Sequence, residues 1–246
     1  MMSNIMMKKL SLWTLVAAAV LIVVLVAAGV TIIVVDKKPT APADVFVRVG
    51  DTYSYKGEPN KKNNAAVSVP ATYNDLPVTE IGANAFKDFK KLTSVTLPDS
   101  ITIIQDNAFN GCTALVSISI PDSVTEICAS AFANCTALKN ITLSQNMGKV
   151  DSKTFENCTS LEAIDFPANI TRVDSKAFSG SGIKTVTVRV DEVLTVVNDS
   201  FPFEQLTSVY VLNNNLVGQY WLTDIWKDYA NMTKNIVKQP LPTDAQ

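Results

Sequence analysis

The sequence predicts an α/β solenoid with turns of about 23 residues, each built from a short parallel strand and a one-turn helix, preceded by one N-terminal transmembrane helix. Phenylalanine recurs at an unbroken interval of 23 residues, at positions 86, 109, 132, 155, 178 and 201. Four successive units, which start at Leu92, Leu115, Leu138 and Leu161, open with the same apolar pattern, L-x-x-V/I-x-L/I/F. Between positions 10 and 35 the chain carries no charge. The first two observations predict the solenoid, and the third predicts the membrane helix.

The uncharged segment 10–35 is long enough to cross a bilayer. As a helix it measures roughly 39 Å, because each residue rises about 1.5 Å. A cleaved signal peptide is the alternative, since Lys8 and Lys9 precede the segment and "AAG" at 27–29 is a small-residue cleavage site. The apolar run continues beyond that site as "VTIIVV", which favours an uncleaved signal anchor.

The charges beside this segment hardly orient it, because Lys37 and Lys38 follow it just as two lysines precede it. We expect a single-pass protein of the plasma membrane with the C-terminal solenoid extracellular. If residues 10–35 are a cleaved signal, the protein is secreted. The predicted organisation is a short N-terminal tail (1–9), the transmembrane signal anchor (10–35), a linker and lead-in segment (36–64), the repeats (65–212), and a C-terminal cap helix and tail (213–246).

Within each repeat, the opening strand alternates apolar and polar residues, as a strand with one buried face should. Pro98, Pro121 and Pro167 end three of these strands. A single turn cannot fold alone: burying six large apolar side chains contributes about 12 kcal/mol, whereas ordering 23 backbone residues costs at least about 23 kcal/mol. The turns must therefore stack into a continuous core. The unit from Ile183 loses one residue early and gains one before Phe201, which keeps the phase.

The repeat pattern L-x-x-I-x-I-P-x-S-V-x-x-I-x-x-x-A-F-x-x-C-x-x resembles the BspA-like, Treponema-type leucine-rich repeat. The segment "VSVPATYNDLPVTEIGANAFKDF" (67–89) is similar to the first unit of that family, with an insertion after the proline, and "YWLTDIWKDYANMTKNI" (220–236) is similar to its closing segment. The resemblance covers about residues 65–237. It implies a surface protein that attaches to cells or contacts host or matrix molecules. A scaffold within a cell-envelope complex is the competing hypothesis.

Four cysteines and a C-terminal aromatic group are candidate sites. Three of the cysteines share one column, three residues after the phenylalanine, where the first unit has Phe89; this predicts buried, inert thiols. Cys128 is expected near the surface, either as a reactive thiol or as an incidental substitution. Tyr220, Trp221, Trp226 and Tyr229 are predicted to cap the open end of the core rather than to bind a ligand. The cysteine column is Cys112, Cys135 and Cys158.

Composition excludes several classes of function. With 21 basic and 23 acidic residues and no basic run beyond pairs such as Lys61-Lys62, the chain is not expected to bind nucleic acid. Histidine is absent, which excludes histidine bases and histidine metal ligands. Neither a glycine-rich phosphate loop nor a G-x-S-x-G motif is present. We therefore predict that the protein is not an enzyme and uses no cofactor or metal.

Six Asn-x-Ser/Thr sequons are present, which in a eukaryotic secretory protein predict surface glycans. Two of them lie in a repeated "NCT", so turn composition alone is the other explanation. They begin at Asn134, Asn140, Asn157, Asn169, Asn198 and Asn231.

The best candidate binding surface is the concave face of the solenoid, formed by the outward residues of the repeat strands. Repeat proteins commonly bind partners there, so a protein or glycan ligand is expected. The alternative is that Ser and Thr merely suit an exposed strand. The predicted residues are Ser94, Thr96, Ser117, Ser119, Asn140, Thr142, Asp165, Thr185, Thr187 and Tyr210.

Overall fold

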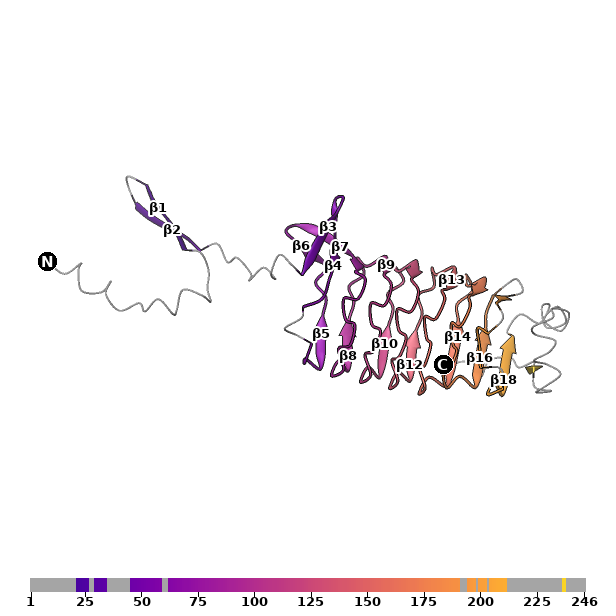
Figure 1. Ribbon diagram of the computed structural model, residues 1–246. Helices are drawn as coiled ribbons and strands as arrows, with labels where there is room; N and C mark the ends of the chain where they lie inside the picture. Colours follow the sequence, from indigo (N-terminus) through magenta and orange to yellow (C-terminus); the bar gives the residue numbers. More distant parts are fainter. Residues whose placement is uncertain are drawn as a thin grey trace, which may run out of the picture. The chain divides into compact units, whose positions relative to one another are not determined.

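The computed structural model describes residues 21–26, 29–34, 45–58, 62–190, 194–197, 199–202, 204–211 and 236–237 (Figure 1). The chain divides into two compact units, Met1–Ala43 and Asp44–Gln246. The second unit is the predicted solenoid. Its turns repeat the same path through a first strand, a second and shorter strand, and a corner (Figure 1).

The first strands of successive turns lie side by side and run parallel, as the repeat pattern predicts. We call their outward side the strand face. Residues 23 apart are partners, as in the pairs Ser117↔Asn140 and Thr185↔Ser208. The strands are β5 (Ala66–Ser68), β8 (Ser94–Thr96), β10 (Ser117–Ser119), β12 (Asn140–Thr142), β14 (Ala163–Phe166), β16 (Thr185–Val188) and β18 (Ser208–Val211).

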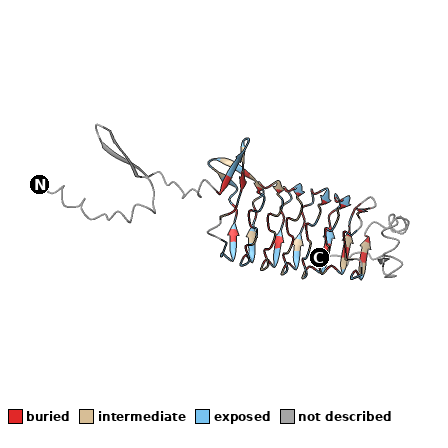
Figure 2. Ribbon diagram, viewed as in Figure 1, coloured by how far each residue is buried: buried red, intermediate tan, exposed pale blue. Residues whose placement is uncertain are grey.

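The second strands pair in parallel within two further sheets, one that contains β4, β7, β9 and β11 and one that contains β13, β15 and β17. Most are only two residues long. One residue of each short strand is buried, and the other is exposed or half-buried (Figure 2). The strands are β4 (Thr52–Tyr55), β7 (Leu76–Ile81), β9 (Ile103–Ile104), β11 (Glu126–Ile127), β13 (Lys149–Val150), β15 (Arg172–Val173) and β17 (Thr195–Val196).

The one-turn helices predicted for the corners are wrong: each corner is a series of tight turns. The N–H groups of Ala85, Lys87 and Phe89 donate to carbonyls three residues earlier, whereas those of Asn84 and Phe86 donate to the next turn of the solenoid. Two positions in each of the first five corners, and one in the described part of the sixth, also have positive φ, which interrupts a right-handed helix. These columns are Asn84, Asn107, Ser130, Lys153, Lys176 and Asp199, and Asp88, Gly111, Asn134, Asn157 and Gly180.

The phenylalanine ladder is the centre of the core, and it explains the fixed period. Consecutive rings from Phe86 to Phe201 stack almost parallel, with centroids 4.8, 5.0, 5.8, 5.2 and 4.9 Å apart. All six side chains are buried. Since each ring contacts the ring of the next turn, a change of repeat length between two phenylalanines would break the stack unless it were compensated.

Compensation of that kind occurs where the sequence predicts it. On the strand face, Ala163 pairs with Thr185, which is 22 residues further along the chain. In the short strands of the same two turns, Arg172 pairs with Thr195, so the offset is again 23 residues. The insertion in the first unit forms a hairpin between β6 (Thr72–Tyr73) and β7. Both residues of its two-residue turn, Asn74 and Asp75, have positive φ, as a type I′ hairpin requires.

The N-terminal end of the solenoid is closed by a hairpin within the predicted lead-in segment. Strand β3 (Phe46–Val49) pairs antiparallel with β4, and β4 pairs parallel with β7 of the first turn. Phe46 stacks on Tyr73 with centroids 4.2 Å apart, and Tyr55 packs on Phe86 at 5.4 Å. The hairpin thereby covers the first ring of the ladder and protects the end of the core from water.

The membrane helix predicted for residues 10–35 is not confirmed. Within this segment the structure describes β1 (Leu21–Val26) and β2 (Gly29–Val34), which pair antiparallel. Both strands are rich in Val and Ile, and β-branched residues favour strands as well as apolar environments. No helix in the described part of the chain has the length and apolarity needed to span a membrane.

At the other end of the chain, the cap helix predicted within residues 213–246 lies outside the described residues, as do Tyr220, Trp221, Trp226 and Tyr229. The exception is β19 (Ile236–Val237), a strand that pairs parallel with β18.

Candidate functional site

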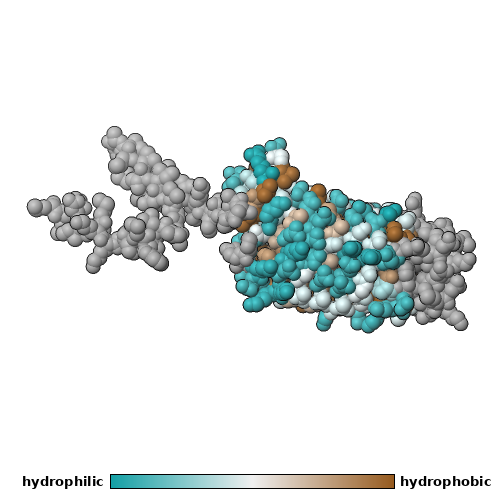
Figure 3. All heavy atoms as spheres, viewed as in Figure 1, coloured by the Kyte–Doolittle hydropathy of each residue, from teal (hydrophilic) through white to brown (hydrophobic). Residues whose placement is uncertain are grey.

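The structure places all ten predicted binding residues on the strand face. In β8, β10, β12 and β14 these residues are exposed, whereas Thr185, Thr187 and Tyr210 are half-buried. The residues between them, such as Ile118 and Ile164, are buried in the core. Figure 3 shows that the surface of the solenoid in this view is mostly hydrophilic. The alternation therefore places polar side chains outward on the strand face of each of these repeats.

The strand face is divided by two breaks in backbone pairing. Its strands pair as β5–β8, as β10–β12 and as β14–β16–β18–β19, so that neither β8 and β10 nor β12 and β14 are paired. Neighbouring turns still connect at the corner, where the N–H of Phe155 donates to the carbonyl of Ala177. The solenoid is thus continuous at its corners, while the strand face opens locally.

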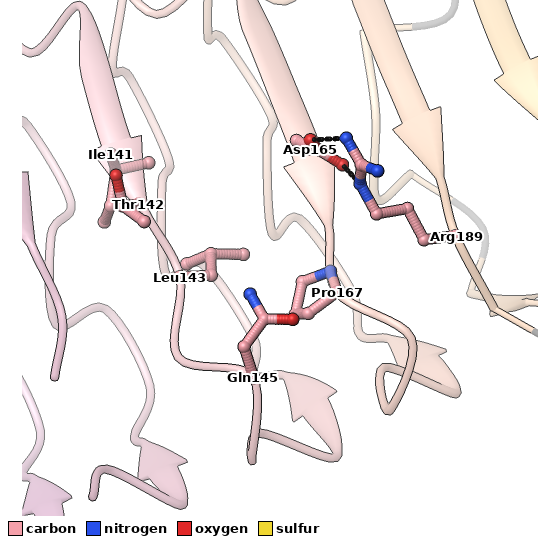
Figure 4. A pocket seen from close by; sticks show the side chains of 7 residues that line it. All are labelled: Ile141, Thr142, Leu143, Gln145, Asp165, Pro167 and Arg189. Atoms are coloured by element: carbon pink, nitrogen blue, oxygen red, sulfur yellow. Dashed lines mark hydrogen bonds and ion pairs between the residues drawn. The ribbon is translucent and has the colours of Figure 1, made fainter. Parts of the chain in front are cut away.

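Two shallow polar grooves lie at the break between β12 and β14. One has a volume of about 390 Å³, and it is lined by side chains from β12, β14 and the loops that follow them, together with Arg189 at the end of β16 (Figure 4). The other, of about 560 Å³, lies at the beginnings of the same two strands. The first is lined by Ile141, Thr142, Leu143, Gln145, Asp165, Pro167 and Arg189, and the second by Lys139, Asn140, Thr159, Ser160, Glu162 and Ala163.

Two ion pairs connect these grooves to the next turn. The guanidinium of Arg189 donates to both carboxylate oxygens of Asp165, at 2.8 and 2.7 Å (Figure 4). The ammonium of Lys184 donates to Glu162 at 2.7 Å. Exposed pairs of this kind stabilise a fold by only about 0–1 kcal/mol. Here they hold opposite charges in fixed positions beside the grooves.

The sequence pattern identified Asn140, Thr142 and Asp165 of these grooves but missed Arg189 and Gln145. Alternation within a strand identifies only residues inside the strand, whereas these two come from the loops that follow it. For Arg189 a signal existed: it comes two residues after Thr187, the strand partner of Asp165, and residues two apart along a strand point to the same face.

Two of the sequons have a structural role. The side-chain amide of Asn157 donates to Asn134 at 3.0 Å, and that of Asn134 donates to Asn110 at 3.1 Å, which forms a ladder along the corner. Asn134 and Asn157 also have positive φ, which Asn tolerates better than most residues. Asn140 and Asn169 are exposed, and Asn198 and Asn231 lie outside the described residues.

The predicted burial of the cysteine column is confirmed. Cys112, Cys135 and Cys158 are fully buried, and each thiol donates to the carbonyl of a phenylalanine in the preceding turn, at 3.1, 3.2 and 3.1 Å. All four cysteines are free. Cys128 is half-buried, and burial together with the carboxylates of Glu126 and Asp106 raises its pKa to about 11. These surroundings disfavour the thiolate, which makes Cys128 a poor nucleophile.

We expect the solenoid to lose stability above about pH 9 because of the cysteine column. Burial raises the pKa of Cys112 and of Cys158 from the ordinary value of 9.0 to about 12, and that of Cys135 well above 9.0. Between these values the unfolded thiols ionise while the folded thiols stay neutral, so stability that is present below pH 9 is lost as the pH rises. For each pH unit between these values, the free energy of unfolding falls by about 1.4 kcal/mol per thiol, or by about 4 kcal/mol for the three thiols together.

Urea unfolding at about pH 8, 9 and 10 measures this loss. A variant with Cys112→Ala, Cys135→Ala and Cys158→Ala starts from a lower stability but should show a flatter pH dependence. Equal pH dependence in both proteins would contradict the assignment to the thiols.

Comparison with known proteins agrees with this architecture. A family model described as "BspA type Leucine rich repeat region" matches residues 79–208 in six copies. No curated protein matches the chain.

Among solved structures, the chain is similar to a leucine-rich repeat protein of T. pallidum, with 24% identity, a TM-score of 0.57, and coverage of 78% of this chain and 94% of that one. It is also similar to the pneumococcal vaccine antigen PcpA, with 20% identity and a TM-score of 0.62, over 80% of this chain and 48% of the antigen. At these identities the likeness supports the fold alone.

Proposed function

Because the chain belongs to the BspA-type leucine-rich repeat family, we propose that it is a membrane-anchored cell-surface protein that binds a protein or glycan partner through the strand face. The observation that carries the proposal is the exposed polar surface that alternation builds across β8, β10, β12 and β14. Seven strands at about 4.8 Å spacing give a face roughly 29 Å long, which is enough for an interface of ordinary size.

We propose binding rather than catalysis. A pair of acidic residues acting as acid and base needs carboxylates that are available to a substrate. On the strand face, Glu162 is paired with Lys184, and Asp165 is paired with Arg189. Fixed opposite charges beside hydroxyl and amide groups instead suit the recognition of a polar partner, where they contribute specificity and orientation.

The strand-face assignment can be tested with Ser117→Arg combined with Thr142→Arg. These positions lie on the paired strands β10 and β12, and both are exposed. Two arginines would place bulk and unpaired charge in the middle of the interface, and we expect at least about a hundredfold loss of affinity for cells or matrix proteins. Binding is measured with the purified protein against immobilised cells or matrix extracts.

A matched control is Thr125→Arg combined with Thr171→Arg, which makes the same changes at exposed positions beside the short strands. The control should bind like the unmodified protein. If the strand-face variant also binds normally, the partner uses another surface.

The second candidate function is a scaffold within a cell-envelope complex. A scaffold should co-purify with fixed membrane partners and show no affinity for external ligands. Protease treatment of intact cells tests location separately: a solenoid that stays protected is not extracellular, whatever it binds.

A further inference from the structure

Within the described residues, four boundaries between turns share one backbone arrangement at the start of the first strand. Two consecutive N–H groups donate to a single carbonyl oxygen of the preceding turn, at distances from 2.7 to 3.4 Å. The backbone at this position therefore points two donors at one acceptor. The donor pairs and their acceptors are Thr93 and Ser94 on Ala65, Lys139 and Asn140 on Val116, Lys184 and Thr185 on Glu162, and Thr207 and Ser208 on Lys184.

The break between β12 and β14 leaves one such pair of donors without an acceptor in the described part of the chain. The N–H groups of Glu162 and Ala163 occupy the equivalent position, and the carbonyl of Lys139 is the expected acceptor. Among the described residues, neither N–H donates a hydrogen bond and that carbonyl accepts none. All three residues line the groove of about 560 Å³ at the beginnings of these strands. Two neighbouring backbone donors of this groove are thus left for a ligand.

The same groove carries a positive charge that no described carboxylate balances. The side chain of Lys139 is exposed and forms no ion pair within the part of the chain that the structure describes. The other charged residue of the lining, Glu162, is paired at 2.7 Å with Lys184 of the following turn. The side chains of Asn140 and Ser160 add neutral hydrogen-bond donors to the lining.

We propose that this groove binds a carboxylate side chain of an acidic protein segment. The inference rests on the proposed function, because it names the chemistry of the partner at the strand face. An ionised carboxylate is only an acceptor and has two oxygens, so it can accept hydrogen bonds from both N–H groups while the ammonium of Lys139 balances its charge. Hydrogen bonds to a charged acceptor are about twice as strong as those between neutral groups.

A protein segment fits the break better than an acidic sugar. At the other end of the two strands, the N–H of Leu143 and the carbonyl of Asp165 form no hydrogen bond among the described residues, although the N–H of Ile120 and the carbonyl of Thr142 bond at the equivalent position. An extended peptide has an N–H and a carbonyl in every residue, so a segment that begins at the first groove can satisfy both groups. The described residues that line the two grooves include no aromatic side chain on which a sugar ring could pack.

Fluorescence anisotropy with a labelled decaglutamate peptide tests the proposal on the full chain in a neutral detergent. We expect binding that a decaglutamine peptide does not reproduce. Lys139→Gln should weaken the binding about tenfold, because the carboxylate loses its charged partner. Lys139→Arg should restore most of the affinity. As a matched control, Lys153→Gln removes the same charge from an exposed position in the corner of the same turn and should leave the affinity unchanged.

Hydrogen exchange, measured by mass spectrometry with fragmentation, distinguishes a bound carboxylate from general attraction to a lysine. In the free protein the N–H groups of Glu162 and Ala163 should exchange faster than those of Lys184 and Thr185, which are hydrogen-bonded. Decaglutamate should slow exchange at the first pair and leave the second pair unchanged.

Two results would overturn the carboxylate site: equal affinity of Lys139→Gln and the unmodified protein for decaglutamate, or unchanged exchange at Glu162 and Ala163. Tighter binding of an oligogalacturonate than of decaglutamate, lost in Lys139→Gln, would overturn the choice of a protein segment in favour of an acidic sugar.

Failure of the carboxylate site is distinguishable from failure of the proposed function. The cell and matrix assay is repeated with Lys139→Gln and with decaglutamate as a competitor. If Ser117→Arg combined with Thr142→Arg abolishes binding but the lysine variant and the competitor do not affect it, the strand face binds the partner and the carboxylate site is wrong. If decaglutamate binds as expected but no binding to cells or matrix is found, the carboxylate site is supported and the proposed function fails.

Discussion

Replacing Phe132 with alanine is expected to lower the free energy of unfolding by about 4 kcal/mol. Phe132 is fully buried in the middle of the ladder. Its ring lies 5.0 Å from that of Phe109 and 5.8 Å from that of Phe155, in both cases nearly parallel. Because a solenoid turn contacts only its neighbours, the cavity weakens the interfaces on both of its sides.

Urea unfolding followed by circular dichroism measures the effect. Val116→Ala is a suitable control, because that side chain is 43% exposed and belongs to the same turn; its change should stay within about 0.5 kcal/mol. The loss of unfolding free energy in Phe132→Leu should lie between the losses in Phe132→Ala and Val116→Ala. A loss below about 1 kcal/mol for Phe132→Ala would show that the ladder does not hold the turns together.

The ladder also shows why most of the fold could be predicted. A side chain that must stack on its equivalent in the next turn has to recur at the same interval, so the period of Phe86, Phe109 and Phe132 records the geometry directly. The slip at Ala163↔Thr185 could be predicted for the same reason, since only a compensated change keeps the rings in contact.

The corners could not be predicted from local preferences. Ser130, Lys153 and Lys176 adopt positive φ although none of these residue types favours it. Hydrogen bonds to the next turn stabilise the conformation, as when the N–H of Lys153 donates to the carbonyl of Ser175. Local reasoning sees an Ala-Phe segment suited to a one-turn helix, whereas the stacking of turns decides the actual backbone.

The candidate site likewise combines residues that the sequence predicts with features that it does not. Alternation placed Asn140, Thr142 and Asp165 on the outward face, because that depends on the strand alone. The break in pairing between β12 and β14 depends on the spacing of two whole turns, and no local pattern encodes it. Arg189 enters the groove for the same reason, across the turn boundary.

Replacing Gly57 with alanine is expected to open the N-terminal end of the solenoid. Gly57 has a φ of +82°, and an added Cβ would lie 1.8 Å from the carbonyl oxygen of Ala85, a backbone atom that cannot move aside. The left-handed conformation costs a non-glycine residue about 1–2 kcal/mol. Displacing the hairpin then exposes Phe46 and Tyr55, at about 2 kcal/mol for each buried side chain. We therefore expect a loss of about 5 kcal/mol, close to the whole stability of a marginal domain.

Gly50→Ala separates conformational strain from the close approach. Gly50 also has positive φ, at +59°, but nothing lies within 4 Å of an added Cβ. In urea unfolding, the Gly50→Ala variant should lose only about 1–2 kcal/mol of unfolding free energy. Light scattering should detect association of Gly57→Ala alone, because a displaced hairpin uncovers the edge of β7, and an uncovered parallel edge can pair with another chain. Equal losses in the two variants would mean that backbone strain, and not the covering of the first turn by the hairpin, determines the role of Gly57.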